Sequence, residues 1–455
     1  MIHIILLKII LCNIIDERMI IMKNKIISVW DACSQPPEFP TLEKSEKTDV
    51  LIIGGGIAGI LTAYFLQERK INYILAEKDR ICRGTTHCTT AKITSQHGFI
   101  YQKLLKSYGI EKTQMYLSAN QKAVKEYEKL CRNIDCDFEK KDNYVFSTRN
   151  RDKVEKEFEA LQKIKANAQL CDRLEIPLKT EGAIKFSNQA QFNPLKFLYH
   201  IAENLNIYEN TFITGIDENT AYFDKGKITA KKIIVTSHFP FINRHGSYPL
   251  KLYQHRSYVI ALENAQKLDG MYVDEYDKGL SFRNYKNIMF LGGGGHRTGK
   301  KGGNWNELRA FAEEHYPHAT EKYFWATQDC ISLDSIPYIG NYSASTPDLF
   351  VASGFNKWGM TSSMVAAKIL CDTICEKRNE YSEVFSPSRS ILKPQLVVNG
   401  VESAVNLLTP TTKRCSHLGC ALKWNKTEHT WDCPCHGSRY EENGEVINNP
   451  AMKNI

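Results

Sequence analysis

The sequence predicts an α/β fold, α+β overall, with a small separate module at the C-terminus. Two segments carry the first part of this prediction. Residues 49–66 and residues 349–361 each show an apolar run of strand length, then a glycine turn, then the start of a helix. The second part rests on cysteines and histidines that gather between Cys415 and His436, after a polar linker at 379–394. We therefore expect two kinds of site, one in each part of the chain.

Length and composition are ordinary for a globular protein of two or three domains. The 455 residues are 42% hydrophobic and 24% charged. The formal charge of +8 is spread over many lysines, which argues against nucleic-acid binding and is compatible with an acidic redox partner. The 14 cysteines without a convincing export signal indicate a reducing compartment. We expect a cytoplasmic protein, with room for peripheral association with a membrane.

The chain begins with an apolar run, MIHIILLKIILCNII, that is too short to span a bilayer. Asp-Glu-Arg follows it without a small-residue cleavage site, so the run does not match a signal peptide. A sequence more typical of a soluble protein opens at Met22. We interpret residues 1–22 as an extension from a misplaced start and expect no transmembrane segment.

The first strand leads directly into Gly54, Gly56 and Gly59, which fit the pattern G-x-G-x-x-G. In this pattern the turn lets the backbone approach a pyrophosphate, and the following helix presents amide donors to it. Glu77 ends the next predicted strand, where its carboxylate can bind ribose hydroxyls. Together these residues predict a dinucleotide site, for NAD or FAD.

Four further segments resemble the D-amino-acid-oxidase-like superfamily of FAD-dependent oxidoreductases, which includes the glycine and sarcosine oxidases. They are a hydroxyl-rich loop (83–97), a returning strand (232–238), a D-x-x-P-x-I-G element (334–340) and a closing strand, turn and helix (349–361). The resemblance implies FAD rather than NAD. It also implies a discontinuous Rossmann-like FAD-binding domain beside a substrate domain built on a mixed sheet.

The resemblance implies domain bounds and a set of FAD contacts. His87 and Cys88 fall near a position where some relatives attach FAD covalently, but we expect noncovalent FAD because many members lack any linkage. The oxidoreductase is assigned to 23–378, with FAD-binding parts near 49–100, 180–240 and 325–378 and substrate-domain parts near 101–180 and 245–320. The implied FAD-binding residues are Gly54, Gly56, Gly59, Glu77, Thr85, Thr86, Thr236, Gly354, Phe355, Trp358, Gly359 and Met360.

The same resemblance implies that an amine or an amino acid is oxidised, with the protein orienting this substrate against the flavin. Four residues are candidates for that work: Lys92 in the hydroxyl-rich loop, Gln328 before the D-x-x-P element, and His296 and Arg297 after a run of four glycines. Because a guanidinium binds both oxygens of a carboxylate, we expect Arg297 to meet the substrate. Lys92 reads equally well as a solvated lysine.

The C-terminal cysteines and histidines form two boxes, C-x-H-x-x-C at 415–420 and C-x-C-H-G-S at 433–438. Thiolate and imidazole ligands that converge in this way indicate a metal or cluster site. Six residues leave several arrangements open, including two ligands on each of two irons with a third pair joined as a disulfide. A Cys2His2 zinc site is weaker, because zinc fingers pair cysteines in one box and histidines in the other.

The two boxes resemble those of the Rieske [2Fe–2S] domain, in which two cysteines hold one iron and two histidines hold the other. The resemblance implies a small all-β module at 395–455, after the linker at 379–394. Only about 20 residues separate that linker from the first box, so strands that ordinarily precede it are missing and the module is truncated. The resemblance implies Cys415, His417, Cys433 and His436 as iron ligands and a disulfide between Cys420 and Cys435.

A flavin and a one-electron cluster in one chain suggest a direction of electron flow. The leading hypothesis is an enzyme that oxidises an amine or amino acid and relays electrons through the cluster to an external acceptor, a protein or a quinone. Two alternatives stay open: a flavin and iron–sulfur redox sensor, and a flavoenzyme with a vestigial Rieske tail. An electron-transfer component serving an oxygenase is disfavoured, because the sequence shows no second dinucleotide pattern for NAD(P)H.

Overall fold

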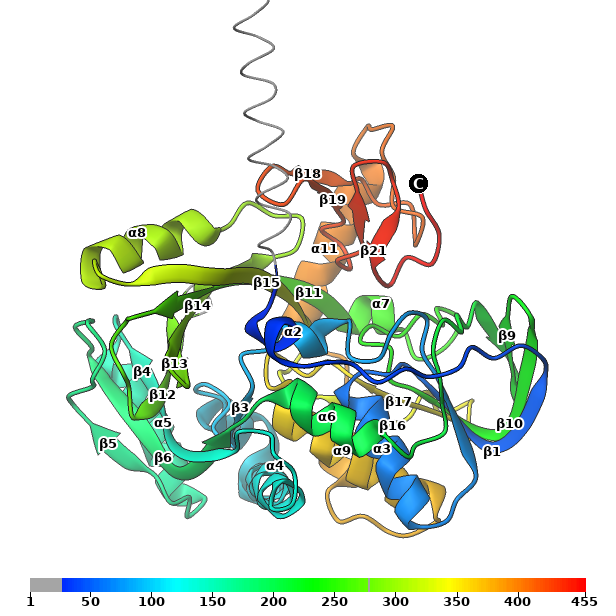
Figure 1. Ribbon diagram of the computed structural model, residues 1–455, viewed down its shortest axis with the longest axis horizontal. Coiled ribbons are helices and arrows are strands. Elements are labelled where there is room, and N and C mark those ends of the chain that lie inside the picture. The colour runs from blue at the N-terminus through cyan, green and yellow to red at the C-terminus, as the bar shows by residue number, and fades with distance from the viewer. Residues whose placement is uncertain (1–26, 277–278) are drawn as a thin grey trace, which may run out of the picture.

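The computed structural model describes residues 27–276 and 279–455, so the predicted extension at 1–22 lies outside the described residues. Two β-sheets lie side by side, and the C-terminal module, coloured orange to red, packs above the place where they meet (Figure 1). Among the residues that the structure describes, no helix is long and apolar enough to cross a membrane. The fold class predicted from the sequence, α/β with a mixed-sheet domain and a small all-β module, is confirmed.

The first sheet has eight strands, and its central strands run parallel. β1 (Glu46–Ile53) pairs in parallel with β2 (Tyr73–Ala76) on one side and with β10 (Gly226–Val235) on the other. Alternate residues of β1 belong to two hydrophobic clusters, one on each face of the sheet. Burial on both faces explains why this strand reads as a continuous apolar run. The other strands are β7 (Ile207–Tyr208), β8 (Gly215–Asp217), β9 (Thr220–Phe223), β16 (Tyr338–Asn341) and β17 (Leu349–Ser353).

The second sheet is mixed, because β12 and β4 pair in parallel among otherwise antiparallel neighbours. Its longest strands, β11 and β15, pair along their whole lengths. β3 and β6 pair here, although their residues fall in the ranges predicted for the FAD-binding domain. The strands are β3 (Lys92–Ile93), β4 (Glu139–Ser147), β5 (Gln169–Cys171), β6 (Gly182–Gln191), β11 (Leu252–Glu263), β12 (Gly270–Asp274), β13 (Ser281–Tyr285), β14 (Ile288–Arg297) and β15 (Thr320–Ser332).

Helices cover both sheets and carry the chain between them. α3 and α9 pack on each other and on the first sheet, where α3 follows the glycine turn directly. The long α4 contains Gly109 in a left-handed conformation, which kinks it. Among the residues described between 27 and 385, the α-helices are α2 (Val29–Cys33), α3 (Ile57–Glu68), α4 (Tyr101–Cys131), α5 (Arg151–Lys163), α6 (Pro194–Ala202), α7 (Tyr248–Lys251), α8 (Trp305–His315), α9 (Gly359–Ile374) and α10 (Ser382–Phe385).

The segment predicted as a polar linker, 379–394, is packed rather than free. It contains α10, and Arg389 in it forms a buried ion pair with Asp334, with Nε 2.7 Å from Oδ2. The same guanidinium donates to the carbonyl oxygen of Pro337 at 3.0 Å. These contacts tie the chain to the D-x-x-P element, so the module leaves the oxidoreductase from a fixed point.

The C-terminal module is an antiparallel sheet of four short strands preceded by one helix, α11 (Pro394–Leu408). α11 occupies the stretch before the first box, and the structure has no named strand between Pro394 and Lys423. On this helix only Asn399 and Asn406 are buried, and several valines and leucines face outward. The strands are β18 (Lys423–Asn425), β19 (Thr430–Asp432), β20 (Arg439–Glu441) and β21 (Val446–Asn448).

Buried ion pairs hold the module on the second sheet. Glu428 of the module accepts hydrogen bonds from Arg256 Nε on β11 and from Arg439 Nη2, both at 2.9 Å. The hydroxyl of Tyr258 donates to the same carboxylate at 3.2 Å. Burial alone would raise the pKa of Glu428, but the two guanidinium groups outweigh it and hold the pKa well below its usual range. The carboxylate is therefore charged and fully paired.

The two parts also touch closely at two glycines. A Cβ at Gly299 would lie 2.6 Å from the nitrogen of Pro434, and a Cβ at Gly437 would lie 2.4 Å from Cβ of Gln254. Both glycines have a positive φ, 76° and 84°. Neither position has room for a side chain, so the module fits closely against β11 and the end of β14.

We predict that Glu428→Gln lowers the free energy of unfolding by about 3–5 kcal/mol at pH 7, because it leaves buried guanidinium groups without their counter-charge. A lowered carboxyl pKa stabilises the fold above the unfolded value of 4.5, so the difference between variant and native protein should shrink as the pH falls below that value. Denaturant unfolding at pH 7 and at pH 4 measures both effects.

Glu263→Gln is the matched control. Its partner Lys322 is close to half exposed, and exposed pairs contribute about 1 kcal/mol or less. Equal losses in the two variants would show that the Glu428 network does not hold the module in place.

Candidate cofactor sites

The turn between β1 and α3 has the geometry that the glycine pattern predicts. Gly54 has φ +111°, and a Cβ there would lie 2.9 Å from the carbonyl oxygen of Thr236. A Cβ at Gly59 would lie 1.9 Å from the carbonyl oxygen of Gly54. Glu77 Oε2 accepts from the backbone N–H of Gly55 at 2.6 Å, and burial raises the pKa of Glu77. The first turn of α3 thus lies open to a phosphate, with an acidic residue beside it.

A cavity of about 930 Å³ runs from this turn to the second sheet and reaches the C-terminal module. Its size is within the usual range for cofactor and ligand sites. Of the twelve residues predicted to bind FAD, only Gly59 does not line it, because Gly59 serves the packing of α3 on the turn. Module residues Ile447, Asn448 and Asn449 line the same cavity. The space is therefore enclosed by both parts of the chain.

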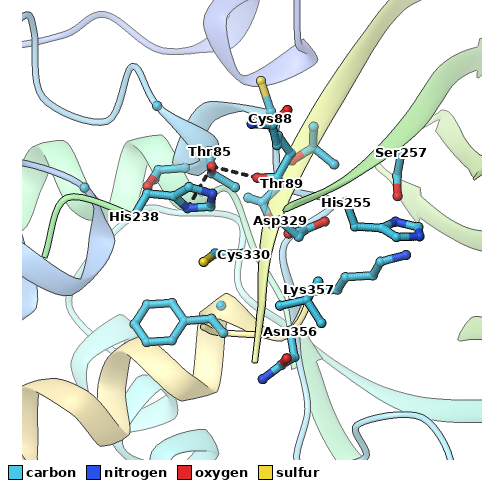
Figure 2. Close-up of a pocket in the computed structure, with 18 of the residues that line it drawn as sticks. Thr85, Cys88, Thr89, His238, His255, Ser257, Asp329, Cys330, Asn356 and Lys357 are labelled. Carbon is cyan, nitrogen blue, oxygen red and sulfur yellow. Dashed lines mark hydrogen bonds between the residues drawn. The ribbon is translucent and has the colours of Figure 1, made fainter. Parts of the chain in front are cut away.

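A chain of hydrogen bonds links the cavity to the second box. His238 Nδ1 lies 3.3 Å from Thr85 Oγ1, and the two face each other in Figure 2. On its other side, His238 Nε2 lies 3.2 Å from Gln254 Oε1. Gln254 Nε2 donates to the carbonyl oxygen of His436 at 2.9 Å. Burial lowers the pKa of His238 to about 4, so this ring is neutral at pH 7.

Two of the predicted catalytic residues line the cavity. Lys92 is not a solvated lysine: its Nζ donates to Thr90 Oγ1 at 3.2 Å, and burial, assisted by Arg283, lowers its pKa to about 7. Gln328 Nε2 donates to Gln254 Oε1 at 2.6 Å and to the carbonyl oxygen of Gly437 at 2.8 Å. Gln328 therefore belongs to the link between the cavity and the module.

The other two predicted catalytic residues do not line the cavity. Arg297, expected to bind a substrate carboxylate, donates instead to the carbonyl oxygens of Pro434 and Cys435, both at 2.9 Å. Its third hydrogen bond goes to Asn399 of α11. His296 stacks on Tyr258, with its Nδ1 3.2 Å from the carbonyl oxygen of Gly294. All three nitrogens of Arg297 thus donate to the protein, so this guanidinium fixes the second box and does not face the cavity.

The two boxes of the module come together at one place. Cys415 and Cys433 are buried, and the rings of His417 and His436 lie edge to face with centroids 5.0 Å apart. Nδ1 of each ring is buried and has no hydrogen-bond partner among the described residues. Buried imidazole nitrogens are ordinarily paired, so these two are suited to binding a metal. The residues present fit a cluster held by two thiolates and two imidazoles.

The two remaining cysteines of the boxes, Cys420 and Cys435, are predicted to form a disulfide. In the structure both are free thiols, and their sulfurs lie within 4.8 Å of each other and of Cys433 Sγ. The bridge is therefore not formed here, although the sulfurs are close, and its formation in the protein stays a prediction.

Comparison with protein families matches residues 49–373 to the FAD dependent oxidoreductase family, and residues 388–455 to the Rieske [2Fe-2S] domain. The first match alone spans well over half of the chain. The chain belongs to the FAD dependent oxidoreductase family. Its cofactors are FAD and a Rieske-type [2Fe–2S] cluster. The resemblance drawn from the sequence is thus confirmed.

Among curated proteins, this FAD dependent oxidoreductase is 35% identical over 490 residues to YhfW of Bacillus subtilis (strain 168), classed there as a Rieske 2Fe-2S iron-sulfur protein. The match covers 93% of this chain and 96% of the relative. Because 490 exceeds the 455 residues of this chain, the relative contains segments that this chain lacks. A cytochrome b6-f complex iron-sulfur subunit of Nostoc sp. (strain PCC 7120) is 49% identical over 41 residues, which cover 9% of this chain and 23% of that protein.

Solved structures share the fold of the oxidoreductase part. Glycine oxidase from Geobacillus kaustophilus matches with a TM-score of 0.64 and 19% identity, covering 76% of this chain and 99% of that one. L-proline dehydrogenase from P. horikoshii matches with a TM-score of 0.64 and 16% identity, covering 76% and 98%. At such identities the likeness establishes the fold alone.

Sequence reasoning did not assign roles to His238, Gln254 or Lys357 in this oxidoreductase. His238 has a left-handed backbone, φ +67°, three residues after the end of β10, and it lines the cavity. Gln254 lies on β11 next to cavity-lining residues, and Lys357 lines the cavity from the turn before α9. The one available signal was position: His238 ends a segment that resembles the family's returning strand, and Lys357 lies inside its closing segment.

We predict that Gly59→Ala loses most of the bound FAD, because the new methyl group would overlap the carbonyl oxygen of Gly54 and open the turn. Gly400→Ala on α11 is the control, since no atom lies within 4 Å of a Cβ there. Flavin absorbance per chain after purification measures the loss. Equal flavin content in both variants would contradict the assignment of this turn.

We predict that Cys415→Ser abolishes iron binding, whereas Cys420→Ala retains iron in a less stable module. The reason is that Cys415 is an implied iron ligand, while Cys420 belongs to the implied disulfide. Iron and acid-labile sulfide per chain provide the measurement. The reverse result would favour a site built on the three close thiols of Cys420, Cys433 and Cys435.

Proposed function

We propose that this oxidoreductase oxidises an amine or amino acid at the flavin and passes the electrons through the Rieske cluster to an external acceptor, a protein or a quinone. Family membership supports the first half of the proposal. Proteins that share the fold include a glycine oxidase, an L-proline dehydrogenase and the L-amino acid deaminase of Proteus vulgaris, whose names refer to amino acids. Flavin chemistry removes two electrons from such a substrate.

The observation that carries the second half is the hydrogen-bonded chain from Thr85 through His238 and Gln254 to the backbone of His436. It joins a residue that lines the flavin cavity to an implied ligand of the cluster. Gln328 adds a parallel link to Gly437. A direct connection of this kind supports transfer between the two cofactors inside one chain.

The orientation of the module supports the same conclusion. The histidines of both boxes face the oxidoreductase part, where the ring of Phe239 lies edge-on to His417 and His436 with centroids 6.3 and 6.1 Å away. Asn449 of the module donates to the carbonyl oxygen of Phe239 at 2.8 Å. The implied iron ligands are thus brought close to the cavity wall.

Lys92 supports a proton-transfer role in the same reaction. A substrate ammonium must lose a proton before the amine can be oxidised, and a lysine with a pKa of about 7 is partly neutral at physiological pH. Lys92 lines the cavity from the hydroxyl-rich loop, so it stays our candidate for the group that accepts this proton. Gln328 is proposed as a positioning residue for the link to the module.

We predict that anaerobic protein expressed from Met22 carries flavin and two irons per chain, and that amino-acid substrates reduce both centres. A panel that includes glycine, sarcosine and L-proline is added without oxygen. Flavin bleaching is followed by absorbance, and cluster reduction by low-temperature EPR, with dithionite giving the full signal. Bleaching without an EPR signal would contradict the relay, and flavin without iron would identify a vestigial tail.

Gln254→Leu tests the link itself. In this variant we expect flavin reduction to keep its rate while the EPR signal grows more slowly, because the contact with His436 is lost. Gln266→Leu is the control, since its amide nitrogen bonds only an exposed backbone carbonyl, that of Glu175. Equal rates of cluster reduction in the two variants would remove Gln254 from the transfer path.

A further inference from the structure

Three ionisable side chains gather on the wall of the cavity that the second sheet provides. His255 on β11 and Asp329 on β15 are directly opposite each other in the antiparallel pairing of these strands, so their side chains project on the same face. Lys357 reaches the same place from the turn before α9. Figure 2 shows the three side chains together, and all three line the cavity. None of them belongs to the nucleotide turn or to the iron ligands.

Each of these three side chains has a polar atom without a partner among the described residues. His255 is only 8% exposed, and its Nδ1 is buried without a hydrogen-bond partner among the described residues. Among the residues that the structure describes, neither the carboxylate of Asp329 nor the ammonium group of Lys357 makes a hydrogen bond or an ion pair. Other buried carboxylates are fully engaged: Glu157 accepts from two backbone N–H groups, and Glu428 from two guanidinium groups. Unused polar groups on a cavity wall indicate a ligand site.

This wall carries one negative and one positive side chain, and the two do not form an ion pair with each other. Asp329 and Lys357 lie beyond the 4.0 Å of an ion pair, yet Lys357 is close enough to favour the ionised form of Asp329. Burial raises the pKa of Asp329 to about 6, which still leaves a carboxylate at pH 7. Burial also keeps the ring of His255 neutral, by lowering its pKa to about 2. The wall therefore offers one anion, one cation and one neutral hydrogen-bonding ring.

We propose that Asp329, His255 and Lys357 form the subsite for a zwitterionic α-amino acid. In this arrangement the carboxylate of Asp329 binds the substrate ammonium, the ammonium group of Lys357 binds the substrate carboxylate, and His255 hydrogen-bonds to the bound molecule. The proposal rests on the proposed function and narrows its substrate class from amines in general to amino acids. It also gives the carboxylate-binding role to Lys357, since Arg297 is occupied by the second box.

The test uses three small molecules of matched shape that lack a hydrogen on the carbon bearing nitrogen or carboxylate, so they bind without being oxidised. They are 2-aminoisobutyrate, a zwitterion, tert-butylammonium, a cation, and pivalate, an anion. Each is titrated into the full-length protein with both cofactors, and the change in flavin absorbance gives the affinity. We expect the zwitterion to bind more tightly than either single-charge probe.

Asp329→Asn should weaken 2-aminoisobutyrate and tert-butylammonium by about ten- to a hundredfold, as the loss of a charge-assisted hydrogen bond does, and should leave pivalate unchanged. Lys357→Met should weaken 2-aminoisobutyrate and pivalate and leave tert-butylammonium unchanged. Lys357 is exposed to the cavity, so this variant keeps the test decisive even if the change at Asp329 disturbs folding. Asp274→Asn is the control: this carboxylate also lines the cavity but already accepts from Tyr276 N at 3.0 Å.

The subsite would be overturned if Asp329→Asn bound 2-aminoisobutyrate as tightly as the native protein does. It would also be overturned if the native protein bound all three probes with equal affinity. Flavin reduction by amino acids is measured separately on the native protein. Probe binding that depends on Asp329 and Lys357 without reduction by any amino acid would retain the subsite and reject the proposed function. If amino acids reduce the flavin but probe binding does not depend on Asp329 or Lys357, the proposed function is retained and the subsite is rejected.

Discussion

The carboxylate of Glu428, buried between two guanidinium groups, is the interaction on which the rest of the structure depends. The C-terminal module has little hydrophobic core of its own: of the seven buried apolar residues in its cluster, four are cysteines. A unit of this size is rarely stable through apolar burial alone. Contacts with Arg256, Tyr258 and Arg297 of the oxidoreductase part stabilise the module. Binding of the cluster at the two boxes adds to this stability.

Because the module is held this way, the flavin cavity is a shared structure. Asn448 and Asn449 form part of its wall, and Gln254 joins Asn449 and His436 to the second sheet with one amide group. The same amide group also lies 3.2 Å from His238 Nε2, so one side chain contacts both the second box and a residue of the cavity wall. A continuous set of hydrogen bonds therefore joins the second box to His238 and Thr85, which line the cavity.

The features that could be predicted from the sequence are those formed by residues close together in the chain. The turn with Gly54 and Gly59 and the two cysteine–histidine boxes are each set within a few residues, so a short pattern contains most of their geometry. The path through Gln254 joins residues 182 positions apart, and it depends on strand register that no local pattern specifies. Arg297 illustrates the difference. Its guanidinium was expected to bind the two oxygens of a substrate carboxylate, but folding brings it instead to the backbone carbonyls of Pro434 and Cys435. The outward valines of α11 were missed for the same reason, because its buried Asn399 bonds Arg297 and Leu250, which are distant in the chain.

The contact of Gly299 with Pro434, and of Gly437 with Gln254, bears on how such a protein can change over generations. Each pair has one member in the oxidoreductase and one in the module, and neither glycine tolerates a methyl group where it stands. A module from another protein would need a glycine at the position of Gly437. It would also need an oxidoreductase part with a glycine at the position of Gly299. Exchange of one part alone is therefore constrained at this junction in the way that substitutions are constrained in the interior of a single domain.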